Sequence, residues 1–197
     1  MYYGNNENII LTDVDGVLLN WIHGFDIWMA KRGFKLQEEH KWDYDMAKRY
    51  NISDDYAWEI IKRFNDSAAI RRLPPLRDAI KYVKKLHEEH GYVFHVITSL
   101  SLDEDAQMLR IDNLERLFGP VFERYVFCDT GAHKRDKLIE YKDTGLYWIE
   151  DNYQNCIDGA EFGLEPLLMN HYFNTHIESE FPRMLTWKDI HDHILGE

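Results

Sequence analysis

Short apolar runs recur along the chain and alternate with longer segments in which apolar residues have helical spacing. Each run has the length and the β-branched or aromatic content of a buried strand. Segments 76–89 and 108–118 place their apolar residues on one face of a helix. This alternation predicts an α/β fold in which helices cover both faces of a parallel sheet. The predicted strands are Ile9–Val14, Tyr92–Ile97, Tyr125–Cys128, Leu146–Ile149 and Leu164–Met169.

Residues 20–73 interrupt this alternation, because the segment is too long to be a simple crossover between two strands. The sequence Leu73-Pro74-Pro75-Leu76 is predicted to end the segment and to begin the next helix, since proline is tolerated in a first turn. We therefore expect a helical insertion after the first strand. The helices that its pattern predicts lie near residues 21–32, 38–50 and 53–64.

The first predicted strand ends in Asp13-Val14-Asp15-Gly16-Val17. Side chains two residues apart in an extended segment point the same way, so the two carboxylates are neighbours. Two like charges held together at the end of a buried strand are costly unless something pairs with them. A divalent cation is the natural partner, and hard oxygen ligands favour Mg²⁺. The simpler alternative is a pair of aspartates that closes a turn.

Polar residues also follow the other predicted strands. Thr98-Ser99 comes directly after the second strand and Glu150-Asp151 directly after the fourth, while Lys134 and Lys137 lie between the third and the fourth. In a parallel sheet the carboxyl ends of the strands face one side, so these residues are predicted to converge with Asp13 and Asp15. Phosphoryl transfer needs such a set: a nucleophile, a metal site and donors for the phosphoryl oxygens.

Composition restricts the classes of partner. The 197 residues suffice for one sizeable core, and the formal net charge of −12 argues against tight binding to long nucleic acid. A small anionic substrate stays possible, because a metal and a few cations can reverse the field at one site. Cys128 and Cys156 form neither a disulfide framework nor a thiol metal site.

The sequence shows no targeting or membrane segment that we can identify. Residues 1–10 carry no basic region and no long apolar stretch, and no apolar run approaches the length of a membrane span. We therefore expect a cytoplasmic protein without a membrane partner. The sequence leaves the oligomeric state open.

The order of these short motifs on alternating strands resembles the haloacid dehalogenase (HAD) superfamily of aspartyl phosphotransferases. Motif one is Asp13-Val14-Asp15-Gly16-Val17, motif two is Thr98, motif three is a lysine, and motif four is Glu150-Asp151. The resemblance implies a Rossmann-like sheet of strand order 5-4-1-2-3. It also implies a core domain of residues 1–19 and 74–197 and a helical cap subdomain of residues 20–73.

The resemblance implies roles for the acidic residues. Asp13 would attack phosphorus and form an aspartyl-phosphate. Asp15 would protonate the leaving alcohol and then deprotonate the attacking water. Mg²⁺ would be held by Asp13, by the backbone carbonyl of Asp15 and by an acid of the Glu150-Asp151 pair, of which either could be the direct ligand.

The resemblance also implies which residues bind the substrate phosphate. Thr98 and Ser99 would donate hydrogen bonds to phosphoryl oxygens, and the motif three lysine would neutralise their charge. Lys134 is favoured over Lys137 by its spacing to Leu138, and Arg110, on the helix after motif two, is a further candidate for this charge.

A narrower resemblance concerns the substrate. The segment from Asp13 to Trp21, with the pattern D-x-D-G-V-L followed by an aromatic residue, and the turn Phe118-Gly119-Pro120 are similar to the 5'(3')-deoxyribonucleotidases. In that family the aromatic residue eight positions after the nucleophile stacks on the nucleobase, and Trp21 holds that place here. Phe25 lies one helical turn later on the same face. The insertion is rich in aromatic residues, which suit a planar base or simply pack between its helices.

The expected function is therefore Mg²⁺-dependent hydrolysis of a phosphomonoester, with a nucleoside monophosphate as the favoured substrate. One alternative is the same chemistry on another small phosphometabolite or on the terminal phosphates of nucleic acid. An alternative of another class is a nucleotide-binding protein that keeps the fold without catalysis.

Overall fold

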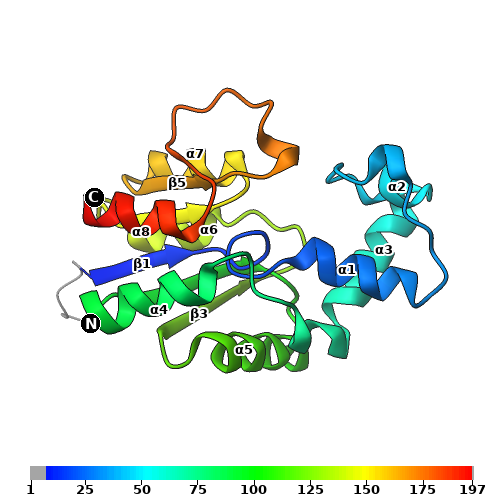
Figure 1. The fold of residues 1–197 in the computed structure, drawn as a ribbon, viewed down its shortest axis with the longest axis horizontal. Helices are drawn as coiled ribbons and strands as arrows, with labels where there is room; N and C mark the ends of the chain where they lie inside the picture. Colours follow the sequence, from blue (N-terminus) through cyan, green and yellow to red (C-terminus); the bar gives the residue numbers. More distant parts are fainter. Residues whose placement is uncertain (1–7, 197) are drawn as a thin grey trace.

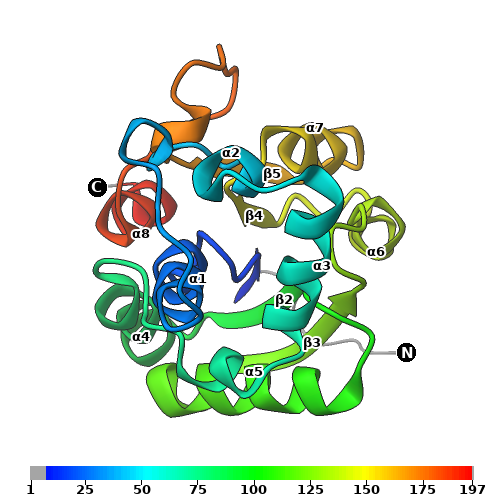
Figure 2. The same ribbon diagram turned by 90° about the vertical axis from the view of Figure 1, so that its right-hand side faces the viewer.

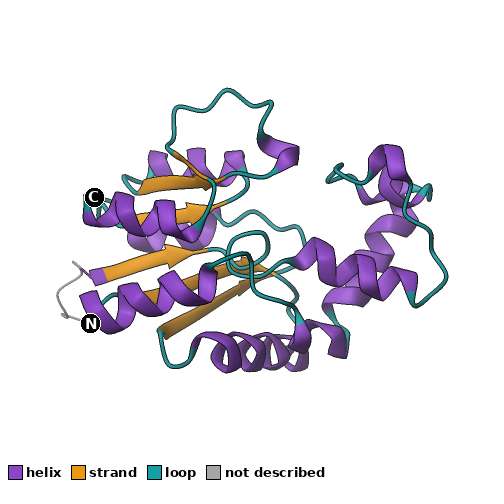
Figure 3. Cartoon of the chain, in the orientation of Figure 1, coloured by secondary structure: helices purple, strands orange, loops and turns teal. Residues whose placement is uncertain are grey.

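The computed structural model describes residues 8–196, and a six-stranded sheet lies at its centre (Figures 1 and 3). The strands are β1 (Ile9–Thr12), β2 (Val93–Ser99), β3 (Phe122–Cys128), β4 (Tyr147–Glu150), β5 (Glu165–Met169) and β6 (Arg183–Met184). All neighbouring strands are parallel. The expectation that no leader segment is present rests mostly on residues 1–7, which lie outside the described part of the chain.

The strand order is β3-β2-β1-β4-β5-β6, which differs from the predicted order 5-4-1-2-3. The difference is β6, which pairs with β5 through Leu168 and Met169 and extends the sheet by one strand. The other five strands have the predicted neighbours when they are read from the opposite edge. A strand of two residues carries no alternation in the sequence, so its pairing arises only from the path of the folded chain.

Helices cover both faces of the sheet. They are α4 (Ala79–His90), α5 (Glu104–Phe118), α6 (Arg135–Leu138), α7 (Tyr153–Glu161) and α8 (Trp187–Leu195). Because successive side chains of a strand point to opposite faces, Ile10 packs with apolar residues of α4, α5 and α8, whereas Leu11 and Trp148 pack with those of α6 and α7's C-terminal end. Burial of both faces explains why the strands read as continuous apolar runs.

Residues 20–73, the predicted insertion, form a series of short helices. They are α1 (Trp21–Ala30), η2 (Glu38–His40), α2 (Met46–Tyr50), α3 (Asp54–Asn65) and η3 (Ala68–Arg72). The sequence predicted one helix near 38–50, but the chain forms two short ones there. α1, α2 and α3 lie beyond the carboxyl ends of the strands (Figure 1), and from that side the end of β1 is seen between α1 and α3 (Figure 2).

The proline pair at the end of the insertion does not begin a helix. Pro75 pairs with Leu19 in an isolated bridge, and the Leu76 N–H donates to the Leu18 carbonyl oxygen over 2.8 Å. α4 therefore starts only at Ala79. Among residues 8–196, no helix is both long enough and apolar enough to cross a membrane.

Candidate active site

A cavity of about 390 Å³ lies beyond the carboxyl ends of the strands, and helices α1 and α3 contribute to its wall. Of the predicted site residues, Phe25 and the alternative phosphate ligands Lys137 and Arg110 do not line it. The others do, and they are Asp13, Asp15, Trp21, Thr98, Ser99, Lys134, Glu150 and Asp151. The parallel arrangement of the strands therefore brings together side chains that are far apart in the sequence.

The turn after β1 is fixed by backbone hydrogen bonds and by one glycine. The Asp13 N–H donates to the Ile149 carbonyl oxygen over 2.9 Å, which holds the end of β1 against β4. Gly16 then adopts a φ of 80°, a conformation that favours glycine. A Cβ atom at this position would lie only 2.0 Å from Asp151 Oδ2. Gly16 thus allows the loop to approach Asp151, which follows β4.

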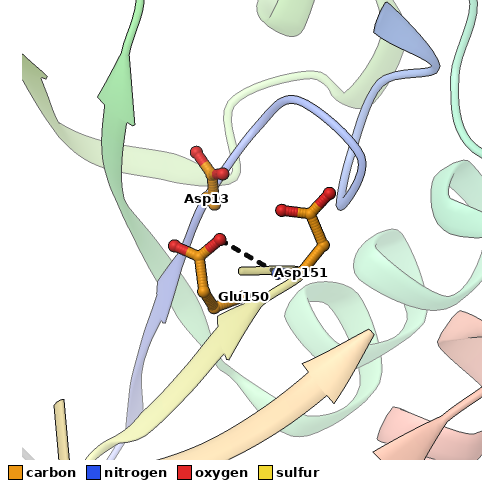
Figure 4. A group of neighbouring side chains, drawn as sticks. All are labelled: Asp13, Glu150 and Asp151. Atoms are coloured by element: carbon orange, nitrogen blue, oxygen red, sulfur yellow. Dashed lines mark hydrogen bonds between the residues drawn. The ribbon is translucent and has the colours of Figure 1, made fainter. Parts of the chain in front are cut away.

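Three buried carboxylates meet beside this turn. Asp13, Glu150 and Asp151 offer oxygen atoms that all lie within 4.8 Å of one another (Figure 4). Burial, with the charges of Glu150 and Asp15, raises the pKa of Asp13 to about 7 although Lys134 opposes the shift. Burial and the Glu150 charge also raise the pKa of Asp151 well above its usual range. Hard oxygen ligands so placed suit a divalent cation such as Mg²⁺.

Glu150 and Asp151 differ in their hydrogen bonds. Glu150 Oε1 accepts from the Asp151 and Asn152 N–H groups over 2.9 and 3.0 Å. Glu150 Oε2 accepts from Lys134 Nζ over 2.8 Å and from Asn155 Nδ2 over 3.0 Å. Within residues 8–196 no hydrogen bond to the Asp151 carboxylate is found, and His171 Nε2 lies 4.0 Å from Asp151 Oδ2. Asp151 therefore has free oxygens for a cation, whereas those of Glu150 are already engaged.

Lys134 lies between two of these carboxylates. Its Nζ is 2.7 Å from Asp13 Oδ2 and 2.8 Å from Glu150 Oε2, and the side chain is only 3% exposed. Burial alone would lower the pKa of Lys134, but the two carboxylates outweigh burial and raise it. Lys137 is partly exposed and does not line the cavity. Of the two lysines, Lys134 is thus the one that reaches the site.

Two buried oxygen atoms of the cavity residues have no hydrogen-bond partner within the described part of the chain. They are Asp13 Oδ1 and Thr98 Oγ1. Buried polar groups are nearly always paired, so unpaired atoms beside a cavity indicate a place for a ligand or an ion. The Ser99 hydroxyl, in contrast, already donates to the Ala132 carbonyl oxygen over 2.8 Å.

Asp15 lines the cavity, and its carboxylate also accepts hydrogen bonds from a buried arginine. Arg110 Nη1 and Nη2 donate to the two Asp15 oxygens over 2.7 and 3.2 Å. The sequence left Arg110 as a candidate phosphate ligand, but it does not line the cavity. It lies on α5 and is fully buried, so the structure places it on Asp15 instead.

The two predicted base-binding residues have different environments. Trp21 lines the cavity, its Nε1 donates to Asn65 Oδ1 over 3.0 Å, and its ring stacks on Phe25 at 4.7 Å between centroids. Phe25, in contrast, is fully buried and does not line the cavity. It packs behind Trp21, edge-on against Phe64 and Tyr50.

Several cavity residues were not predicted as part of a site. His171 follows β5, donates from Nε2 to the Gly16 carbonyl oxygen over 2.6 Å, and stacks on Phe173. The strand-end argument could have found it, because it follows the fifth predicted strand in the same way. Tyr44 and Trp58 also line the cavity. Nothing in the sequence separated these two from the aromatic residues that pack inside the insertion.

No protein-family profile matches the chain. An uncharacterized 32.4 kDa protein of Enterobacteria phage T4, from the Gp30-rIII intergenic region, is 28% identical over 195 residues, which cover 95% of this chain and 69% of that protein.

Solved structures resemble the fold over almost the whole chain. A haloacid dehalogenase-like family hydrolase from Streptococcus pneumoniae has a TM-score of 0.64 and 14% identity, covering 95% of this chain and 98% of its own. The D,D-heptose 1,7-bisphosphate phosphatase from B. bronchiseptica, solved with magnesium and phosphate, has a TM-score of 0.60 and 13% identity over 96% of this chain and 98% of its own. The structural neighbours are HAD-superfamily hydrolases, phosphatases and dehalogenases, and the chain has their fold.

Proposed function

We propose that this protein is a Mg²⁺-dependent phosphomonoester hydrolase that acts through an aspartyl-phosphate on Asp13. The observation that carries the proposal is a pair of buried oxygens, Asp13 Oδ1 and Thr98 Oγ1, that have no hydrogen-bond partner among residues 8–196 and belong to residues that line one cavity. A carboxylate nucleophile and a hydroxyl donor are two of the parts that phosphoryl transfer requires. The HAD-like fold and the buried acidic cluster support the same chemistry.

In the proposed first step, a carboxylate oxygen of Asp13 attacks phosphorus and the bond from phosphorus to the ester oxygen breaks. Asp15 enters this step as a carboxylic acid and gives its proton to the departing alkoxide, which leaves as an alcohol, so that Asp15 is left as a carboxylate. In the second step water attacks phosphorus, Asp15 takes a proton from that water, and the bond from phosphorus to Asp13 breaks. Inorganic phosphate leaves and both aspartates return to their starting states.

The charge of the phosphoryl group would be met by residues around Asp13. The Lys134 ammonium lies next to the Asp13 carboxylate and would neutralise phosphoryl oxygens, while Thr98 Oγ1 would donate a hydrogen bond to one of them. The Ser99 side chain is engaged with Ala132, so Ser99 would contribute through its backbone.

A metal ion fits the acidic cluster by the chemistry of its donors. Asp13 Oδ1 and the Asp151 carboxylate are free of hydrogen bonds from residues 8–196 and would hold Mg²⁺, with the backbone carbonyl of Asp15 as a further ligand. The bound ion would supply positive charge that stabilises the phosphoryl oxygens. Glu150 would instead hold Lys134 in place.

We propose residues 20–73 as a cap that selects the substrate over a core of residues 1–19 and 74–197. Trp21, Tyr44 and Trp58 of the proposed cap line the cavity, and their rings suit a planar group. The proposed substrate is a nucleoside monophosphate whose base stacks on Trp21, because Asn65 and Phe25 fix the orientation of that indole.

Phosphate release from purified protein tests the proposal. The substrates are nucleoside monophosphates, sugar phosphates, an oligonucleotide with a terminal phosphate and 4-nitrophenyl phosphate, each with Mg²⁺ and with EDTA. We expect Mg²⁺-dependent release that is highest with a nucleoside monophosphate and is lost in Asp13→Asn. Tight nucleotide binding without release from any substrate would contradict catalysis and favour a binding role.

A further inference from the structure

The pairing of Arg110 with Asp15 suggests a residue that acts on the chemistry from outside the cavity. We infer that Arg110 is a positioning residue, which fixes the position of the Asp15 carboxyl group for its proton transfers. This inference rests on the proposed function, because Asp15 is the acid and base of that reaction. It assigns a role to a buried arginine that does not touch the substrate site.

The geometry of the pair restricts the carboxylate in position and in orientation. Arg110 Nη1 donates to Asp15 Oδ1 over 2.7 Å and Nη2 to Asp15 Oδ2 over 3.2 Å. Two parallel hydrogen bonds from a planar guanidinium fix the plane of a carboxylate, whereas a single bond would leave it free to rotate. Asp15 comes from the loop after β1 and Arg110 from α5, so the pair joins two elements that are distant in the sequence.

The exposed fractions of the two side chains show from which side Arg110 reaches Asp15. The Arg110 side chain is 0% exposed and the Asp15 side chain is 22% exposed. Asp15 lines the cavity and Arg110 does not. Arg110 therefore holds the carboxylate from the protein interior and leaves its cavity side open to a substrate oxygen.

The arginine has no other anionic partner within residues 8–196. Its Nε is buried without a hydrogen bond, and its terminal nitrogens bond only to Asp15. A buried guanidinium without its carboxylate would be costly, so the pair strongly favours one position of Asp15. The next turn of α5 is also held, because Asn113 Nδ2 donates to the Leu73 carbonyl oxygen over 3.1 Å.

Substrates with different leaving groups should depend to different degrees on the position of Asp15. An alkoxide needs a proton as the bond to phosphorus breaks, whereas 4-nitrophenolate leaves readily without one. Correct placement of Asp15 therefore matters more for an alkyl phosphate than for 4-nitrophenyl phosphate in the first step. The ratio kcat/KM reports the steps up to that first phosphoryl transfer. A residue that merely stabilises the fold would affect both substrates equally.

The test measures kcat and KM of Arg110→Gln and Arg110→Lys with a nucleoside monophosphate and with 4-nitrophenyl phosphate. Arg116→Gln is the matched control, because Arg116 lies exposed on the same helix. For Arg110→Gln we expect kcat/KM to fall roughly 100-fold with the nucleotide, within the usual range for general acid catalysis, and much less with 4-nitrophenyl phosphate. We expect partial recovery in Arg110→Lys, and no change in Arg116→Gln.

The double variant Asp15→Asn/Arg110→Gln removes both charges, so it keeps the test available if Arg110→Gln alone does not fold. We expect it to be no slower than Asp15→Asn, because Arg110 acts only through Asp15. Equal losses on both substrates, a raised KM with unchanged kcat, or a further loss in the double variant would overturn the inference. An inactive wild type would overturn the proposed function itself, which separates the two failures.

Discussion

The acidic pair at the end of β4 shows how two adjacent carboxylates acquire different surroundings. Glu150 is fully buried and its oxygens accept four hydrogen bonds, one of them from Lys134. Asp151 accepts none from residues 8–196, and burial with the Glu150 charge raises its pKa well above the usual range. At the scale of single residues, Glu150 has the surroundings of a structural group and Asp151 those of a metal ligand.

This difference predicts that two conservative substitutions have opposite effects on the stability of the metal-free protein at pH 8. Because the pKa of Asp151 is raised in the folded protein, its ionisation lowers the stability of the metal-free folded state at pH 8. Below the ordinary pKa of about 3.8 the side chain is protonated in both the folded and the unfolded state, so this loss of stability disappears. Asp151→Asn should therefore raise the melting temperature in EDTA and weaken Mg²⁺ binding by more than about 10-fold. Glu150→Gln should lower the free energy of unfolding by about 2 kcal/mol or more, because Lys134 loses a buried partner.

Thermal unfolding of both variants, with a Mg²⁺ titration at pH 8, measures both effects. Asp151→Asn at pH 4 is the internal control, because the stabilisation in EDTA should shrink there. Loss of Mg²⁺ binding in Glu150→Gln alone, with normal binding in Asp151→Asn, would reverse the assignment of the two acids.

At the scale of elements, helix α1 presents its first residue to the cavity and buries the next turn. Trp21 is held by Asn65 of α3 and stacks on Phe25, which fills the space between α1 and α3. The helical spacing of Trp21 and Phe25 predicts that both rings lie on one face of the helix, but it does not predict which of them is buried. That outcome depended on the packing of α3, which the sequence of α1 does not contain.

Trp21→Ala should therefore weaken a nucleotide more than a small substrate. Stacking of a base on an aromatic ring is worth roughly 1–3 kcal/mol, so kcat/KM for a nucleoside monophosphate should fall roughly 5- to 150-fold. The loss with 4-nitrophenyl phosphate should be clearly smaller. Trp42→Ala is the matched control, since Trp42 is exposed and does not line the cavity. An equal loss on both substrates would assign Trp21 to packing alone.

Strand ends were the part of the site that could be predicted from the sequence. Asp13, Thr98 and Glu150 converge because parallel pairing aligns the ends of their strands. This convergence was predictable, since short apolar runs in the sequence identify the buried strands. The partner of Asp15 could not be predicted, because a helical residue reaches the site only through the way in which α5 packs. The strand β6 was missed for a related reason, since two residues carry no periodic signal.

At the scale of the whole molecule, two of the contacts between the insertion and the rest of the chain involve residues that line the cavity. The entry and exit of the insertion lie side by side, because the Asn20 N–H donates to the Pro74 carbonyl oxygen over 2.9 Å. On the other side of the cavity the rings of Tyr44 and Phe173 are 4.7 Å apart between centroids. A paired connection on one side and an aromatic contact on the other support the proposal that residues 20–73 act as a cap, which would enclose a substrate over Asp13 and exclude water from the first step.

The central claim is that Asp13 carries the phosphoryl group, and chemical trapping tests it most directly. Wild-type protein is quenched in acid during turnover with Mg²⁺ and its best substrate, and borohydride then reduces any aspartyl-phosphate to homoserine. Peptide mass spectrometry should find homoserine at position 13 only in samples that received substrate. Turnover without modification of Asp13, or with modification of another carboxylate, would contradict the account.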